Sequence, residues 1–231
     1  MESVIFKAQP DRKAIPIGKA LFLLFLIICL EAGSLFLYPL LMNKARIAPL
    51  FFTAIQRIAD LAIILGFIFK WGYCFEHLGL SAKRLKKGII HGFFWCMGFG
   101  LVVALISAVL YFLGINPFLF LRCTKNRSLT GIITYILIGC FLGPMVEDLL
   151  FTGLIYNGLR TRLNIAYSSL IVSILFASVH AIAYGFISIA LIIQFVGGLL
   201  FTLSFEFSGS LLTPMIIHWC GNMAIFAIQI I

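Results

Sequence analysis

Long hydrophobic runs separated by short polar stretches organise this chain of 231 residues. A helix needs about 20 mostly apolar residues to cross a bilayer. Seven regions approach that length, and they cover residues 17–42, 50–70, 88–113, 129–159, 164–183, 187–205 and 211–231. The pattern predicts an all-α fold, a polytopic transmembrane helical bundle. We find no linker or internal repeat, so residues 1–231 are expected to form a single integral membrane domain.

The fourth region is too long for one straight crossing, and it contains Gly143-Pro144. A proline inside a helix removes a hydrogen bond and clashes with the preceding turn. We therefore expect a broken helix at Gly143-Pro144 and a new helix from about Met145, which gives seven to eight helical segments. Glu147 and Asp148 would then lie in a first helical turn, where the helix dipole favours carboxylates.

The composition excludes an ordinary soluble protein. Apolar residues make up 62% of the chain and charged residues 11%, whereas soluble domains carry about 25% charged residues. A disordered chain and a disulfide scaffold are excluded on the same ground. The six cysteines include no CxxC pair, and we interpret them as small apolar residues rather than as a redox or metal framework.

The formal charge of +9 is best explained by membrane topology. Basic residues lie mostly between the apolar runs, where they orient helices and meet anionic lipid headgroups, so no nucleic-acid partner is expected. A cytoplasmic N-terminus places 11 of the 17 basic residues on the cytoplasmic side. Lys83–Lys87 is expected to form a loop on that side. The first apolar run is too long for a cleaved signal peptide.

Ionisable residues in a spanning helix are costly and point to function by default. In the N-terminal half these residues are Glu31, Asp60 and His91. Asp60 follows Arg57 by three positions, so the two can pair on one helix face, whereas Glu31 is alone in the first region. We assign structural or interfacial roles to all three.

The C-terminal half concentrates Glu147, Asp148, His180, His218 and Asn222 in three regions. The four-residue spacing of the last two places them on one helix face. A carboxylate can take a proton from water, a histidine can orient that water, and His and Asn donors can hold an oxyanion. The same groups could instead bind zinc, although no HExxH motif is present. They could also line a transport path or serve packing.

Three motifs in this half resemble those of a known family. They read Glu147-Asp148-Leu149-Leu150-Phe151-Thr152-Gly153, Phe176-Ala177-Ser178-Val179-His180 and His218-Trp219-Cys220-Gly221-Asn222. Their order and spacing resemble the EExxxR, FxxxH and HxxxN/D motifs of the CPBP intramembrane proteases. This family, also called Abi, includes CAAX prenyl proteases of type 2 and bacteriocin-processing enzymes. The resemblance covers residues 129–231, which would be the catalytic half.

The resemblance implies a role for each matching residue. Glu147 would activate water, His180 would hold and polarise that water, and His218 and Asn222 would form the oxyanion site. The supporting positions would be Asp148, Phe151, Thr152 and Phe176. The family is viewed as glutamic proteases, so we expect no metal cofactor and keep zinc in reserve.

Two departures from the family pattern affect the site. Asp148 replaces a second Glu, which shortens the reach of the carboxylate, and Thr152 replaces the motif's Arg. Threonine can donate a hydrogen bond but cannot compensate a charge. A divergent active subfamily, an altered base or an inactive member would each account for this change. Because the other motif positions are intact, we favour an active enzyme.

The resemblance thus implies a glutamic-type endopeptidase, which we expect in a bacterial or archaeal membrane. Its substrate would be a membrane-associated protein or peptide precursor, with CAAX-type, bacteriocin-type and sorting-signal processing all open. One alternative is a non-catalytic membrane partner or immunity protein. Another is a transporter that uses Glu147 as an ion-coupling carboxylate, although such proteins often have a second, symmetry-related broken helix, which we do not find.

Overall fold

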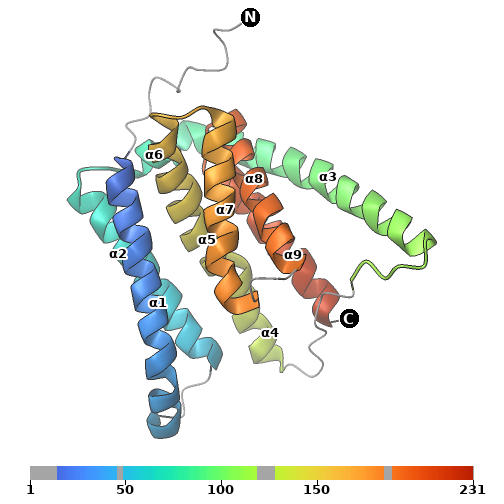
Figure 1. Ribbon diagram of the computed structural model, residues 1–231, viewed down its shortest axis with the longest axis horizontal. Coiled ribbons are helices and arrows are strands. Elements are labelled where there is room, and N and C mark those ends of the chain that lie inside the picture. Colours follow the sequence, from blue (N-terminus) through green and yellow to red (C-terminus); the bar gives the residue numbers. More distant parts are fainter. Residues whose placement is uncertain (1–14, 46–48, 119–127, 185–188, 231) are drawn as a thin grey trace, which may run out of the picture.

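The computed structural model describes residues 15–45, 49–118, 128–184 and 189–230. Every regular element in these ranges is a helix, which confirms the predicted all-α class (Figure 1). The elements are α1 (Ile17–Ala45), α2 (Pro49–Lys70), the 3₁₀ turn η1 (Phe75–Leu78), α3 (Ala82–Phe112), α4 (Leu129–Tyr135), η2 (Ile136–Leu142), α5 (Gly143–Glu147), η3 (Asp148–Tyr156), α6 (Asn157–Arg160), α7 (Ile165–Tyr184), α8 (Ile189–Ser208) and α9 (Leu212–Ile230).

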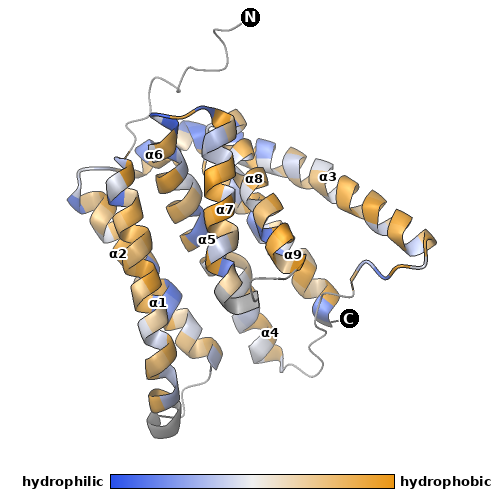
Figure 2. Ribbon diagram, in the orientation of Figure 1, coloured by the Kyte–Doolittle hydropathy of each residue, from blue (hydrophilic) through white to orange (hydrophobic). Residues whose placement is uncertain are grey.

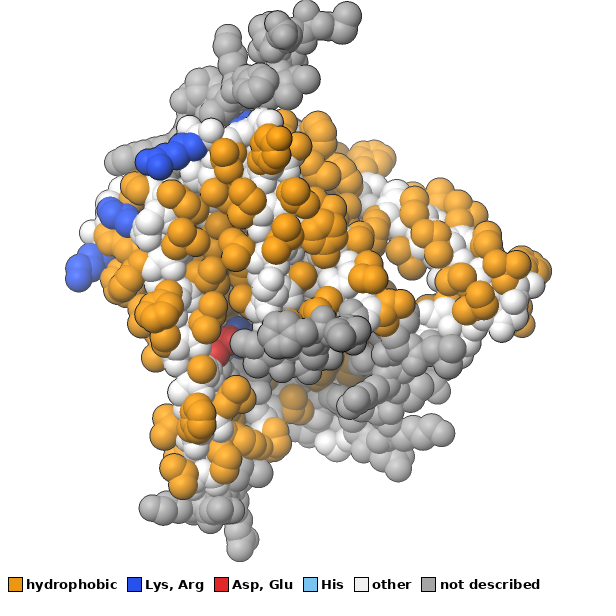
Figure 3. Space-filling view, in the orientation of Figure 1, with side chains coloured by type: hydrophobic (Ala, Val, Ile, Leu, Met, Phe, Trp, Pro, Cys, Tyr) orange, Lys and Arg blue, Asp and Glu red, His pale blue; other side chains and the backbone are white. Residues whose placement is uncertain are grey.

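The helices have the lengths and surfaces of a membrane protein. Five helical stretches in the described ranges are long and apolar enough to cross a bilayer, and α7 contributes a shorter apolar helix. Hydrophobic residues follow most of the length of the helices (Figure 2). They also dominate the outer surface, where the visible Lys and Arg side chains gather toward one end (Figure 3). The protein is therefore an integral membrane protein.

The basic run at Lys83–Lys87 is helical, so the expected loop is wrong. The run forms the first turns of α3, and Ser81 occupies the N-cap position. Lys and Arg are good helix formers, and serine is a preferred N-cap residue.

Several basic residues counted for the membrane topology lie outside the described residues, namely Lys7, Arg12, Lys13, Arg46, Arg122, Lys125 and Arg127. Cys123 and residues 187, 188 and 231 also lie outside them. The five described cysteines are free.

The fourth region does not break at Gly143-Pro144, contrary to expectation. The chain passes through α4, η2, α5, η3 and α6 without leaving helical geometry, and η2 and η3 are π-helical. The Gly143 N–H donates to the carbonyl of Ile138, five residues back. This wider turn accommodates Pro144, whose ring would clash in a tighter α-helical turn. Glu147 and Asp148 consequently lie within a continuing helix and not at a helix N-terminus.

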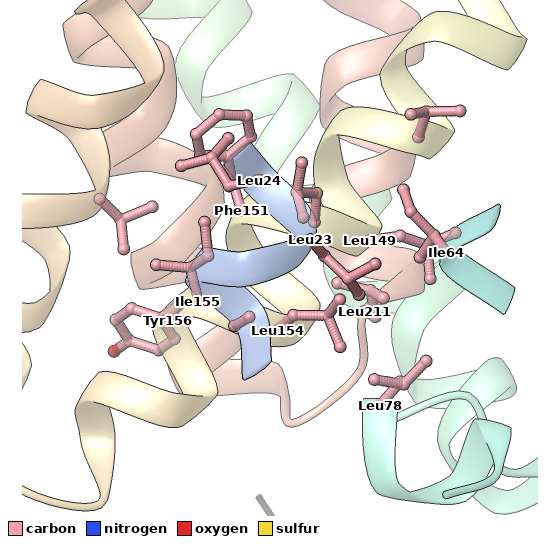
Figure 4. Packing of buried hydrophobic residues seen from close by; sticks show 14 of the residues in the cluster. Leu23, Leu24, Ile64, Leu78, Leu149, Phe151, Leu154, Ile155, Tyr156 and Leu211 are labelled. Atoms are coloured by element: carbon pink, nitrogen blue, oxygen red, sulfur yellow. The ribbon is translucent and has the colours of Figure 1, made fainter. Parts of the chain in front are cut away.

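The π-helical segment η3 forms the centre of the hydrophobic core. Each of its nine residues, from Asp148 to Tyr156, is buried. Figure 4 shows Leu149, Leu154, Ile155 and Tyr156 among side chains of other elements, namely Leu23, Leu24, Ile64, Leu78 and Leu211. The stretch that directly follows Glu147 is therefore held from several sides.

Two glycines allow close helix approaches that position the C-terminal helices. A Cβ atom added to Gly198 of α8 would lie 2.8 Å from the Cα of Ser173 in α7. A Cβ at Gly88 of α3 would lie 2.9 Å from the Cβ of Leu212 in α9. Small residues let helix backbones approach in membranes. Farther along, α3 diverges from the bundle and exposes its hydrophobic side chains (Figure 1).

Candidate active site

Three ionisable side chains from three helices lie close together in the bundle. Glu147 at the end of α5 has its Oε2 atom 3.9 Å from His180 Nε2 of α7 and 3.7 Å from His218 Nε2 of α9. The Glu147 and His180 side chains are 20% and 19% exposed, whereas that of His218 is 7% exposed. The carboxylate and one imidazole are therefore partly accessible, while the second imidazole is buried behind them.

A backbone contact fixes the proton position on His180. Its Nδ1 atom lies 2.7 Å from the carbonyl oxygen of Phe176. A carbonyl can only accept, so Nδ1 carries the hydrogen and donates it. In the neutral ring, Nε2 then presents a lone pair toward Glu147. His180 is thus arranged to accept a hydrogen bond from a water molecule beside that carboxylate.

The second carboxylate, Asp148, lies on the buried side of His218. Its Oδ2 atom is 3.4 Å from His218 Nδ1, and its side chain is 1% exposed. The imidazole of His218 therefore lies between two consecutive carboxylates, with Glu147 at Nε2 and Asp148 at Nδ1. Among the described residues, no three His, Cys, Asp or Glu side chains are grouped so as to hold a metal ion.

Aromatic rings form the wall of the site. The Phe176 ring lies 4.6 Å from His180, 6.0 Å from His218 and 5.2 Å from Phe151, measured between centroids. Phe201 of α8 stacks on His218 at 4.4 Å with an interplanar angle of 23°. The two motif phenylalanines thus contribute to the site by packing. Phe201 had no sequence signal, because it is one of 24 phenylalanines in a hydrophobic chain.

Asn222 binds the backbone of the π-helical segment. Its Nδ2 atom donates to the carbonyl oxygen of Gly139 at 3.0 Å. In the i to i−5 pattern of η2, that carbonyl would receive the N–H of residue 144, which is a proline and has none. Asn222 therefore supplies the missing donor, and Trp219 Nε1 donates to the nearby carbonyl of Phe141 at 3.2 Å. One of the two amide hydrogens of Asn222 is thereby used.

The position of the family's arginine is filled by a buried threonine with no charge to offer. Thr152 is 1% exposed and lies within η3. Farther along the same helical run, Arg160 pairs with Glu206 of α8, Nη2 to Oε1, at 3.0 Å. Tyr156 also donates its hydroxyl to Glu206 at 2.9 Å. Sequence reasoning missed Glu206 because the sixth hydrophobic region was taken to end at residue 205.

The charged residues of the N-terminal half form a separate cluster. The predicted contact between Arg57 and Asp60 is confirmed, with Nη1 and Oδ2 3.3 Å apart. Arg57 also pairs with Glu31 across α1 and α2, so the single acid of the first region has its partner on the second helix, in keeping with the structural role expected for it. His91 lines an apolar groove between α3 and α8.

Comparison with known proteins agrees with the motifs. Residues 128–224 match the family model described as Rce1-like, type II CAAX prenyl endopeptidase Rce1-like. No curated protein and no solved structure matches the chain. The matched segment contains Glu147, His180, His218 and Asn222, together with the π-helical turns that position them. The match supports the assignment of this part of the chain to the CPBP family of intramembrane proteases, and the segment is similar to the type II CAAX prenyl endopeptidases.

Proposed function

We propose that the protein is an intramembrane endopeptidase in which Glu147 activates the attacking water. The observation that carries this proposal is the approach of Glu147 to within 3.9 Å of both His180 and His218, with the Glu147 and His180 side chains partly exposed. A carboxylate and two imidazoles at such separations can bind one water molecule between them and act on it. The family match supports peptide hydrolysis as the reaction.

The proposed reaction gives a role to each of the four groups. Water donates one hydrogen to Glu147 and the other to the Nε2 lone pair of His180, so that an oxygen lone pair points at the peptide carbonyl. Glu147 takes the proton as the C–O bond forms, and His218 Nε2 and Asn222 donate hydrogen bonds to the developing oxyanion. Glu147 then gives the proton to the leaving amine as the C–N bond breaks.

A peptidase assay in nanodiscs tests the activity and the substrate class together. The panel contains a prenylated CAAX-type peptide, its unprenylated counterpart, a bacteriocin-type precursor and a sorting-signal peptide. We expect cleavage of at least one of them, with oxygen from isotopically labelled water in the new carboxylate. Since the family match names CAAX prenyl endopeptidases, the prenylated peptide is the expected substrate. If the wild-type protein cleaves no member of the panel, a non-catalytic partner becomes the better reading.

Replacing Asn222 with Ala should lower kcat, because the reaction would lose an oxyanion donor. Such a loss typically costs about 10²–10³ in turnover. The matched control is Trp219→Phe, which also removes a donor to a backbone carbonyl of the π-helical segment. We expect it to lower the melting temperature while kcat per folded molecule stays near wild type. A stability loss with intact kcat in Asn222→Ala would assign that residue to backbone support alone.

The proposed chemistry requires no metal, because Glu147 itself supplies the base. We expect activity to survive treatment with a strong chelator, and elemental analysis of the active protein to find less than stoichiometric zinc. Loss of activity on chelation, followed by recovery on adding zinc, would contradict this assignment.

We propose that the end of the bundle that carries most of the described basic residues is cytoplasmic. The start of α1, the end of α2, η1, the start of α3 and α6 lie together there (Figure 1), and cytoplasmic loops are enriched in Lys and Arg. In a cysteine-free background, Lys86→Cys should resist an impermeant thiol reagent added outside intact cells. Asn116→Cys, beyond the opposite end of α3, should react. The reverse pattern would invert the topology.

A further inference from the structure

Two buried polar atoms of the site face each other and have no other hydrogen-bonding group. Asp148 Oδ2 and His218 Nδ1 are both inaccessible, and neither forms a hydrogen bond elsewhere in the described part of the chain. They are 3.4 Å apart, slightly longer than an ordinary N–H···O bond of about 2.7–3.2 Å. Because a buried polar atom left unpaired is costly, a small rotation of the carboxylate that completes this bond is favoured.

The substitution at Thr152 makes this contact the main charge interaction of Asp148. The charged groups that act on Asp148 are His218, which is of opposite sign when protonated, and Glu147, which is of like sign. An ionised carboxylate can only accept hydrogen bonds. The donor facing it must therefore be His218 Nδ1, with the hydrogen placed on that nitrogen.

The rest of the pocket fixes the plane of the same ring. Phe201 stacks on one face of His218, and the edge of Phe176 lies near it at an interplanar angle of 76°. With the plane set by stacking and Nδ1 directed at Asp148, Nε2 is directed toward Glu147 Oε2 at 3.7 Å. A hydrogen on Nδ1 also means that His218 can donate from Nε2 only as an imidazolium, whose counter-ion is then Asp148.

We infer that Asp148 is a positioning residue for His218: it accepts the Nδ1 hydrogen and directs Nε2 toward the reacting carbonyl. This inference rests on the proposed peptidase function and deepens it. It also explains how the site operates without the arginine of the family motif. Asp148 touches neither the water nor the peptide, since its side chain is 1% exposed behind the imidazole.

Kinetics of Asp148 variants provide the first test. Asp148→Asn should lower kcat by about 10²- to 10⁴-fold, the range seen when the carboxylate that orients a functional histidine is altered, and should change KM only a few-fold. Asp148→Glu, which keeps the charge, should recover at least part of the loss. The matched control is Asp60→Asn, an equally buried acid in the cluster with Arg57. It should lower stability but preserve kcat per folded molecule.

Nitrogen NMR of isotopically labelled histidine provides a test that does not depend on activity. The chain has four histidines, and His218→Gln assigns the relevant signal. We expect a protonated Nδ1 on His218 in the wild type. Its signal should shift in Asp148→Asn, while that of His180, held by the Phe176 carbonyl, stays in place. An unprotonated Nδ1 in the wild type, or wild-type kcat in Asp148→Asn, would overturn the inference.

The outcomes separate this inference from the proposed function. If Glu147→Gln is inactive and Asp148→Asn behaves as wild type, only the role of Asp148 is wrong. If Glu147→Gln retains turnover, the proposed function fails, and the NMR result still decides whether Asp148 holds the ring. Should Asp148→Asn fail to fold, the wild-type Nδ1 signal and the kinetics of Asp148→Glu decide the matter.

Discussion

Glu147→Gln should lower kcat on the order of 10³–10⁴-fold, because a general base typically contributes up to about 10⁴. The amide has nearly the same shape but cannot accept the proton from water. The fold should survive, since the side chain is partly exposed and makes only long contacts with His180 and His218. The measurement is single-turnover cleavage of the best substrate in the panel, with the melting temperature recorded on the same sample.

The control for Glu147→Gln is Glu206→Gln. Glu206 is also an acid inside the bundle, but it pairs with Arg160 and lies outside the site. We expect this variant to lose stability while its turnover per folded molecule stays near wild type. Near-wild-type cleavage by a folded Glu147→Gln protein would remove Glu147 from the role of base.

Arg160→Met should cause the largest loss of stability among the variants considered. Arg160 donates to Glu206 from Nε at 3.3 Å and from Nη2 at 3.0 Å, and to the carbonyl of Leu163 from Nη1 at 2.7 Å. Breaking a buried ion pair by removing one partner costs about 3–5 kcal/mol, because the other charge stays buried. The melting temperature should fall by roughly 10 °C for a chain of this size.

Two further variants separate the ion pair from a general effect of losing an arginine. Arg162→Met removes the same residue type two positions away, where the side chain is exposed, and should change the melting temperature little. The double variant Arg160→Met with Glu206→Gln should be more stable than Arg160→Met alone, since no unpaired buried charge remains. A double variant less stable than the single one would show that the pair is not the source of the loss.

Much of the fold could be predicted from the sequence because the bilayer restricts the choice. Backbone groups in hydrocarbon must be satisfied internally, so a long apolar run implies a helix, and all seven predicted regions contain one. The residues of the site could be predicted for a related reason. Ionisable groups are rare in such helices, so Glu147, His180 and His218 stood out from the apolar background, and the structure brings them together.

What could not be predicted depends on details that single residues do not signal. Pro144 predicts a break because a proline in an α-helical turn clashes with that turn and leaves one carbonyl without a hydrogen bond. The turn before Pro144 is π-helical, so a different carbonyl loses its donor and the helix continues. The contact of Asn222 with Gly139 follows from that local register. The pairing of Asp148 with His218 could not be predicted, because the sequence does not show on which side of the imidazole ring each carboxylate lies.

The two π-helical stretches limit how the length of this chain can vary. A π-helix holds more residues per turn than an α-helix, so η2 and η3 change the angular phase of the residues between them. The direction in which Glu147 points is thus set by the number of residues in the run from Leu129 to Arg160, as well as by their identity. Deleting one residue from η2 would shift this phase and turn the carboxylates away from their present direction toward the histidines. Chain length in this segment is therefore constrained more strictly than most of its hydrophobic side chains, which tolerate volume-conserving exchange.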